Sequence, residues 1–198
     1  MKFPFHEQIV LENDRVRLEP LELSHVDALT PIAIKYPGLC KYMSYPFGTR
    51  EDMVHYVQSS LDKRANRERY SFVIFDKPTR TYAGSTSFLN IVDKDSRLEI
   101  GSTWVSKDFH RTGLNRHCKF LLMTFAFETL KCERLEFKTD ARNKQSQKAI
   151  KAIGGKFEGT LRSHSVMSDG FRRDTVYYSV LKEEWPGIKT LVFSEMNT

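Results

Sequence analysis

The sequence predicts one domain of the α/β (α+β) class, in which helices flank a mixed central β-sheet of about six to seven strands. Three observations support this fold class. The 198 residues suit one domain of ordinary size. A content of 40% hydrophobic and 28% charged residues is typical of a globular protein. Segments with strand periodicity alternate with segments of helical periodicity. We expect the domain to span residues 1–198, with its core at about 15–185.

The first elements are a strand and a helix. Apolar and charged residues alternate in Arg15–Leu21, which is the pattern of a strand with one buried face. Ser24 and Asp27 then have the spacing of a capping box and predict the start of a helix.

An aromatic loop, a second helix and three strands follow. We expect Leu39–Gly48 to form a loop, because it is interrupted by Pro46. Thr49 and Asp52 predict the cap of a second helix that runs to about Ala65. Turn-rich segments then separate three strands of a meander, which are Tyr70–Asp76, Tyr82–Asn90 and Leu98–Val105.

The second half of the chain returns to helical periodicity. Leu114–Leu130 carries apolar residues at helical spacing and should lie against the sheet. A strand, a short helix and a last hairpin complete the fold as Leu135–Thr139, Ser146–Ile153, Phe157–Met167 and Phe171–Leu181. A helix between two strands gives a parallel pair, whereas hairpins give antiparallel pairs, so the sheet should be mixed.

Net charge and composition limit the classes of ligand that the protein could bind. The formal net charge of +6 fits either a nucleic acid or a polyanionic small molecule such as a nucleotide or coenzyme A. The sequence has no concentrated basic tail, low-complexity tract or repeat, which disfavours a nucleic-acid partner.

Cysteine usage and hydropathy indicate a compartment. Cys40, Cys118 and Cys132 show no CxxC or Cys/His spacing, so we expect neither a disulfide framework nor a metal site. No segment reaches the roughly 18 apolar residues of a membrane helix, and the first residues do not have the pattern of a leader peptide. We therefore expect a soluble cytoplasmic protein with no membrane partner.

The segment from His110 to Arg116 is a candidate phosphate site. It leads from a strand into the first turn of a helix, where unpaired backbone N–H groups and the helix dipole favour phosphate. Gly113 allows close approach of the backbone, and Arg111 and Arg116 add charge. A purely structural turn is the alternative interpretation.

A second polar turn supports the same site. Asn143 and Ser146 stand just after the next strand, at the start of the following helix. Where neighbouring strands of a mixed sheet diverge, the ends of both strands can face one extended ligand.

Three motifs resemble a known family. They are EIGSTWVSKDFHRTGLN (Glu99–Asn115), FKTDARNKQSQKAIKAIGGKFEG (Phe137–Gly159) and DGFRRDTVYYSVLKEEW (Asp169–Trp185). The chain resembles the GNAT superfamily of acetyl-CoA-dependent N-acetyltransferases over Val16–Trp185. Within that superfamily it is most similar to the branch of ribosomal-protein N-terminal acetyltransferases (RimJ/RimL-like).

The resemblance implies acetyl-CoA as cosubstrate and no metal. His110–Asn115 stands where the family has a Q/R-x-x-G-x-G/A pyrophosphate loop, with His110 replacing Gln or Arg and Asn115 replacing the last small residue. Val105, at the splayed end of its strand, would offer backbone groups to the pantetheine arm. The implied cofactor-binding residues are Trp104, Val105, His110, Arg111, Thr112, Gly113, Leu114, Asn115, Arg116, Asn143 and Ser146.

The same resemblance gives four catalytic candidates. Glu99 and His164 compete as general base, and each has a plain structural alternative. Histidine titrates near neutral pH, which suits that role. Ser146 either donates to the coenzyme thiolate or caps its helix. Tyr177 could supply a proton, but only one of the neighbouring Tyr177 and Tyr178 can face the cleft. The cysteines have no paired histidine, so we expect direct transfer.

The sequence leaves the acceptor open among several classes. We expect transfer to a primary amine, and the resemblance to the ribosomal-protein branch favours a protein N-terminal α-amine. The pKa of such an amine, about 8, leaves about a tenth neutral at pH 7, so a modest base would suffice. One alternative is a small amine such as an antibiotic or a polyamine. Another is a non-catalytic coenzyme- or RNA-binding module. A homodimer is compatible with the sequence.

Overall fold

A computed structural model of the chain describes residues 1–39, 41–42, 48–167 and 169–196. Within these residues, eight strands form one mixed sheet in the order β1-β2-β3-β4-β5-β6-β8-β7. Every strand that the sequence predicts is present, with bounds that move by at most two residues. The strands are β1 (Leu11–Glu12), β2 (Val16–Pro20), β3 (Arg69–Asp76), β4 (Thr81–Val92), β5 (Arg97–Val105), β6 (Arg134–Asp140), β7 (Lys156–Val166) and β8 (Arg172–Leu181). The expected mixed sheet is confirmed, and the strand not foreseen is the short β1 at its edge.

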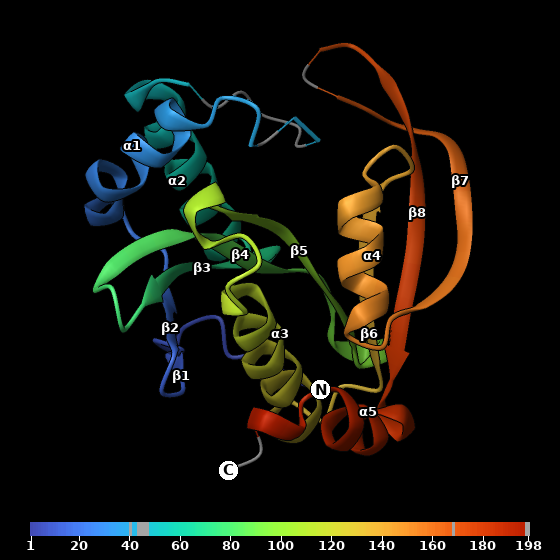
Figure 1. Ribbon diagram of the computed structural model, residues 1–198. Coiled ribbons are helices and arrows are strands. Elements are labelled where there is room, and N and C mark those ends of the chain that lie inside the picture. The colour runs from blue at the N-terminus through green and yellow to red at the C-terminus, as the bar shows by residue number, and fades with distance from the viewer. Residues whose placement is uncertain (40, 43–47, 168, 197–198) are drawn as a thin grey trace.

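Helices cover both faces of the sheet (Figure 1). On one face lie α3 and α4, whereas α1 and α2 lie on the other, and α5 packs beside α3. Their bounds are α1 (Val26–Lys35), α2 (Arg50–Ala65), α3 (Leu114–Thr124), α4 (Lys144–Ala152) and α5 (Trp185–Val192). None of the helices in the described residues combines the length and hydropathy of a membrane-spanning segment.

The helix starts test the capping predictions. Thr49 and Asp52 form the expected reciprocal cap of α2, with both N–H to side-chain oxygen distances at 3.0 Å, and α2 ends at Ala65 as expected. The cap expected from Ser24 and Asp27 is wrong. His25 Nδ1 instead accepts the backbone N–H of Glu22 at 3.0 Å, so a 3-10 turn forms first and α1 starts at Val26.

The expected helix over Leu114–Leu130 and the expected loop Leu39–Gly48 are each matched only in part. The helix expected over Leu114–Leu130 is regular only to Thr124 and continues as a π-helical segment, Phe125–Thr129. Of the expected loop Leu39–Gly48, residues 40 and 43–47 lie outside the described residues, and so does residue 168 in the last hairpin turn.

Two apolar cores lie on opposite faces of the sheet. The larger core joins the sheet to α3, α4 and α5, and the smaller one packs Leu29 and Met53 of α1 and α2 against Val73 and Trp104. Both ends of the chain contribute to the larger core, through Phe3, Phe5, Ile9 and Phe193.

The sheet divides between β5 and β6. In the described residues their parallel pairing is limited to Arg97 with Arg134, Leu98 with Leu135, and Glu99 with Glu136. Beyond these pairs the two strands diverge (Figure 1). This confirms the expected break between neighbouring strands.

An irregularity in β5 shapes the free part of that strand. The pairing of β4 with β5 shifts between Ser85 and Ser87, and Ser102 has a positive φ of 47°. Gly84 (φ 152°) crosses this region closely, because a Cβ there would lie 2.1 Å from the Trp104 carbonyl oxygen. The glycine therefore sets how near β4 lies to the end of β5.

Lys119 joins α3 to the same strand. Its side chain is buried, and Nζ donates to Thr103 Oγ1 at 2.7 Å. Burial lowers the pKa of Lys119 from 10.5 to about 8, because an apolar environment disfavours the charged form.

We predict that Gly84→Ala lowers the free energy of unfolding by about 2 kcal/mol or more. The new methyl group meets backbone atoms of β5, which cannot move aside as a flexible side chain could. Gly187→Ala in α5 is the control, since no atom lies within 4 Å of its added Cβ, and alanine favours helix. Urea denaturation compares the two variants, and equal stabilities would contradict the prediction.

We predict that Lys119→Met stabilises the fold at pH 7 by up to about 3 kcal/mol. The pKa of Lys119 is lowered in the folded state, so the cost of burying it is full below pH 8 and fades as pH rises from about 8 to 10.5. The gain should therefore be smaller at pH 10 than at pH 7. Urea denaturation at both pH values tests this, with exposed Lys148→Met as control. A gain independent of pH would contradict it.

Candidate active site

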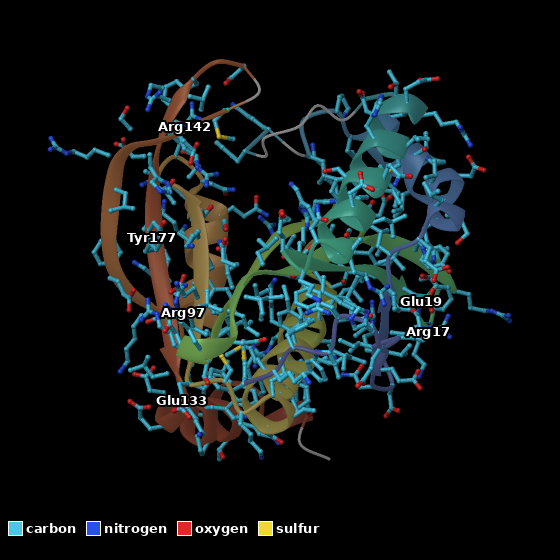
Figure 2. The ribbon with its side chains drawn as sticks, turned by 180° about the vertical axis from the view of Figure 1, so that it is seen from behind. Arg17, Glu19, Arg97, Glu133, Arg142 and Tyr177 are labelled. Carbon is cyan, nitrogen blue, oxygen red and sulfur yellow. The ribbon has the colours of Figure 1, made fainter. Side chains whose placement is uncertain are left out.

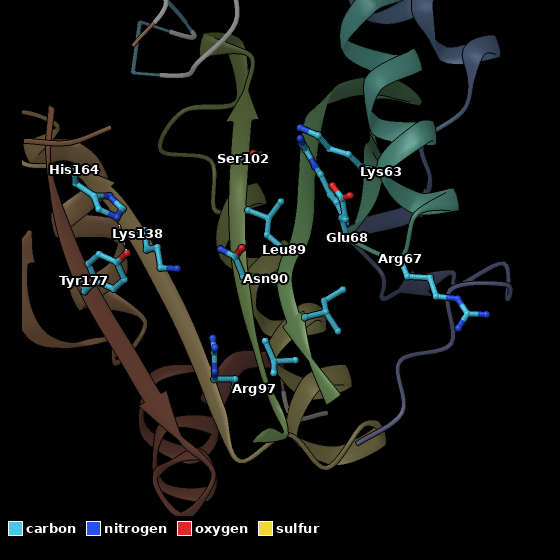
Figure 3. A pocket seen from close by; sticks show the side chains of 13 residues that line it. Lys63, Arg67, Glu68, Leu89, Asn90, Arg97, Ser102, Lys138, His164 and Tyr177 are labelled. Atoms are coloured by element: carbon cyan, nitrogen blue, oxygen red, sulfur yellow. Dashed lines mark hydrogen bonds between the residues drawn. The ribbon is translucent and has the colours of Figure 1, made fainter. Parts of the chain in front are cut away.

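A cavity of about 780 Å³ opens beside the divergence of β5 and β6. Its wall combines the C-terminal end of α2 and the following turn with residues of β3 to β8. Of the sequence candidates, His164 and Tyr177 line it directly, and Figure 3 shows their side chains facing it across from Lys63. Viewed from behind, Tyr177 lies on the half of the sheet formed by β6, β7 and β8 (Figure 2).

Glu99 reaches this cavity through its partners. Its carboxylate is buried, and Oε2 accepts the Asn90 side-chain amide at 2.6 Å and pairs with Lys138 Nζ at 3.0 Å. Asn90 and Lys138 both line the cavity. The other oxygen, Oε1, lies 2.9 Å from where a Cβ on Gly101 would stand, so this glycine leaves room for the carboxylate.

Lys138 contacts two of the catalytic candidates, Glu99 and Tyr177. Besides Glu99, it pairs with Glu136 at 3.3 Å, and its Nζ lies 4.8 Å from the centroid of the Tyr177 ring. Burial alone would lower the pKa of Lys138, but Glu99 and Glu136 outweigh this, so the pKa is raised and the ammonium stays charged. Burial also opposes ionisation of Glu136, yet Arg134 and Lys138 hold its pKa below the usual range.

His164 and Tyr177 form a second group. His164 Nδ1 lies 3.0 Å from Thr175 Oγ1, and Nε2 lies 3.5 Å from the Tyr177 hydroxyl. Tyr178, by contrast, is 1% exposed and packs in the larger core. The expectation that only one of the two tyrosines faces the cleft is therefore confirmed.

The segment after β5 leads through a glycine into α3. Gly113 has a positive φ of 86° and is the N-cap of α3, and no atom lies within 4 Å of its would-be Cβ. His110 Nε2 lies 3.1 Å from the Val105 carbonyl oxygen and ties the loop to the strand. Because Ser106 N–H donates to Ala83, ladder alternation turns the backbone groups of Val105 away from β4, towards the divergence.

The other cofactor candidates near the loop differ in burial and in hydrogen bonding. Asn115 Oδ1 is buried, with no hydrogen-bond partner in the described residues. Thr112 donates to the Phe109 carbonyl and stabilises the turn, whereas Arg111 is exposed at a φ of 63°. The side chains of Leu114 and Trp104 are buried in the cores, so only their backbone groups could face a ligand.

The structure places Arg116 differently from the sequence expectation. Its guanidinium pairs with Glu195 at 2.9 Å, donates to the Val192 carbonyl and lies over the Phe193 ring. Arg116 therefore holds the C-terminal segment, and its contact with phosphate stays a prediction.

The start of α4 also differs from one expectation. Asn143 is the N-cap, and its Oδ1 accepts the Ser146 N–H at 3.0 Å. Ser146 is therefore not the N-cap that was its structural alternative. No hydrogen bond of its hydroxyl group is recorded in the described part of the chain. Ser146 is not among the residues that line the cavity.

A link from α1 supports the loop. Asp108, just before it, accepts Lys35 Nζ at 3.0 Å and the Tyr36 hydroxyl at 2.5 Å. These bonds lower the pKa of Asp108. Sequence reasoning missed this link and the central place of Lys138. Strand alternation in β6 was the available signal for Lys138, because it puts Glu136 and Lys138 on one face.

Known proteins share both sequence and fold with this chain. The acetyltransferase (GNAT) domain family matches residues 15–156. A Bacillus subtilis (strain 168) protein named "Putative ribosomal N-acetyltransferase YdaF" is 34% identical over 106 residues, which is 54% of this chain and 57% of that protein. The chain thus spans little more than half the length of this relative.

Solved structures agree on the architecture. A GCN5-related N-acetyltransferase from Brucella melitensis superimposes with a TM-score of 0.89 at 27% identity, over 96% of this chain and 86% of its own. The ribosomal L7/L12 α-N-protein acetyltransferase RimL shares the fold at 20% identity, with a TM-score of 0.78 over 91% of this chain and 98% of its own. Since the family match covers more than half of the chain, this protein belongs to the GNAT family of acetyltransferases.

Proposed function

We propose that this protein transfers an acetyl group from acetyl-CoA to a primary amine, and that the acceptor is the α-amino group of a protein N-terminus. The observation that carries the proposal is the divergence of β5 from β6, with the phosphate-type loop at the end of β5 and the cavity beside the same strand. The names of the ribosomal acetyltransferases among its relatives support the choice of acceptor.

The residues at the loop suit acetyl-CoA. The first turn of α3 and the glycine at its start would hold the pyrophosphate, with Arg111 close by in the chain. Asn115 is retained as a candidate of the loop, although its Oδ1 is buried. Backbone groups of Val105 would hold the pantetheine arm. Bound acetyl-CoA supplies an acetyl group activated as a thioester.

The acceptor amine must lose a proton before it can attack a carbonyl carbon. Both Glu99 and His164 are retained as candidates for the base, and the geometry favours His164. Its Nε2 is at the cavity wall beside Tyr177, whereas the Oε2 of Glu99 already accepts from two donors. Tyr177 would relay or return a proton, and Ser146, with its hydroxyl group unengaged, would donate one to the departing thiolate.

A covalent route through either cysteine of the described residues, Cys118 or Cys132, is disfavoured. Burial raises the pKa of the Cys118 thiol to about 12 and that of Cys132 to about 11. Neither thiol therefore provides a thiolate nucleophile at neutral pH. Direct transfer remains the proposed route, and the cytoplasmic location stays a prediction.

We predict thiol release from acetyl-CoA when the protein meets peptides with free N-termini, measured in a thiol-release assay across peptides, polyamines, aminoglycosides and amino acids. Gly113→Asp should abolish both turnover and acetyl-CoA binding, since it puts a carboxylate where phosphate should sit. Gly113→Asn is the matched control, because asparagine tolerates the positive φ without the charge. Absence of turnover together with absence of a thermal shift by acetyl-CoA would refute the proposed function.

We predict that His164→Gln lowers kcat/KM by about 100-fold or more, because the variant has no basic nitrogen beside Tyr177 at the cavity wall. Glu99→Gln keeps the side-chain shape and should lower kcat/KM less. Steady-state kinetics of the two variants distinguish the candidates. The opposite ranking would assign the base to Glu99.

A further inference from the structure

The wall of the cavity is rich in positive charge. One acidic residue, Glu68, contributes to it directly in the described residues. The basic residues that line it are Lys63, Arg67, Arg69, Arg97 and Lys138. Figure 3 shows Lys63 on the α2 side and Lys138 on the opposite side, and the Arg67 side chain extends outward from the turn after α2.

Part of this charge is already balanced. Lys138 pairs with Glu99 and Glu136, and Arg97 lies 3.5 Å from Asp95 and 3.7 Å from Glu136. These cations therefore maintain the fold of the strand ends, and little of their charge is available to a ligand.

The cations on the α2 side differ. No ion pair is recorded for Lys63 or Arg67 in the part of the chain that the structure describes, and Arg67 Nη2 lies 3.1 Å from His6 Nε2. Arg69 is buried (3% exposed) and donates to Ser87 Oγ at 3.0 Å. On the α2 side of the cavity, the described residues thus include two cations with no recorded ion pair, Lys63 and Arg67, beside the carboxylate of Glu68.

The two sides of the cavity are chemically distinct. His164 and Tyr177 stand on the β7–β8 side, where the proposed proton transfer occurs, and the cations Lys63 and Arg67 stand across from them. A volume of about 780 Å³ accommodates several residues of a peptide. An acceptor whose amine meets His164 therefore places the atoms that follow against the cations.

We propose that the acceptor is an anionic amine, which carries a carboxylate or phosphate group within a few residues' length of the amino group. A peptide with acidic side chains directly after its N-terminal residue has this chemistry, and so does a small amine bearing a phosphate. Polyamines and aminoglycosides are repelled by the same cations, so the cavity selects against them. This inference rests on the proposed function, since it assigns the reacting amine to the His164 side.

The test uses three peptides of equal length that begin with alanine and continue with Glu-Asp, Gln-Asn or Lys-Arg. Phosphoethanolamine and spermidine serve as small anionic and cationic amines. We expect kcat/KM for the acidic peptide to exceed that for the amide peptide about tenfold, with the basic peptide lowest. The preference should shrink as salt rises from 50 to 500 mM, as screening requires. Turnover of phosphoethanolamine but of no peptide would identify a small-molecule source of the anion.

Substitutions of Lys63 and Arg67 test whether these two side chains cause the preference for an anionic acceptor. Lys63→Gln combined with Arg67→Asn should bring the ratio of acidic to amide kcat/KM close to one, and Arg67→Glu should invert it. Asparagine suits the positive φ of 60° at position 67. Arg80→Gln is the control, because this exposed arginine lies in the turn at the other end of β3 and β4 and should keep the wild-type ratio.

A measurement of peptide binding tests this inference separately from the proposed function. Fluorescence anisotropy of labelled peptides needs no turnover. Charge-selective binding without acetylation would refute the proposed function and support the inference. Equal acetylation of all three peptides would refute the inference and support the proposed function. Failure of both the acidic peptide and phosphoethanolamine to bind would overturn the inference, as would a ratio unchanged in the double variant.

Discussion

The short parallel pairing between β5 and β6 is the constraint on which the site depends. Because the two strands are held together only from Arg97 to Glu99 and their partners, the rest of each strand follows its own neighbours. β5 stays with β4, whereas β6 stays with β8 and β7. The divergence leaves backbone groups of β5 without a neighbouring strand, and an unpaired strand edge in a folded protein calls for a ligand or a cover. The bulge at Ser102 and the close crossing at Gly84 give that edge its shape.

A pair of buried carboxylates next to this divergence is a second constraint on the site. Glu99 and Glu136 stand side by side at the last paired position of β5 and β6, where two buried carboxylates would repel each other. Lys138, two residues further along β6, contacts both carboxylates, and its positive charge offsets their repulsion. The same ammonium lies over the ring of Tyr177. One side chain thus stabilises the point where the strands part and also positions a tyrosine at the cavity wall.

Much of this architecture was accessible from the sequence. Alternation located β2, in which every second residue is buried, and turn-rich segments located β3, β4 and β5. The reciprocal cap of Thr49 and Asp52 is a local interaction that needs no tertiary information. The start of α1 was missed because His25 provides through its ring nitrogen what the expected Ser24 and Asp27 pair would have provided. The partners of Arg116 could not be predicted from local sequence, because they come from the distant C-terminal segment. The basic side of the cavity comes from one short stretch, Lys63–Arg69, but local sequence does not show that this stretch faces His164 and Tyr177, which lie much later in the chain.

The attachment of Arg116 to the C-terminal segment has a consequence for how such a protein can change over generations. The first turn of α3 is shared between the proposed coenzyme loop on one side and the Val192 carbonyl and Glu195 on the other. A lineage that shortened its C-terminus would release a guanidinium next to the loop and alter the local field without any substitution there. Loop sequence and tail length are therefore coupled traits, and we expect relatives with a shorter tail to carry a different residue at position 116.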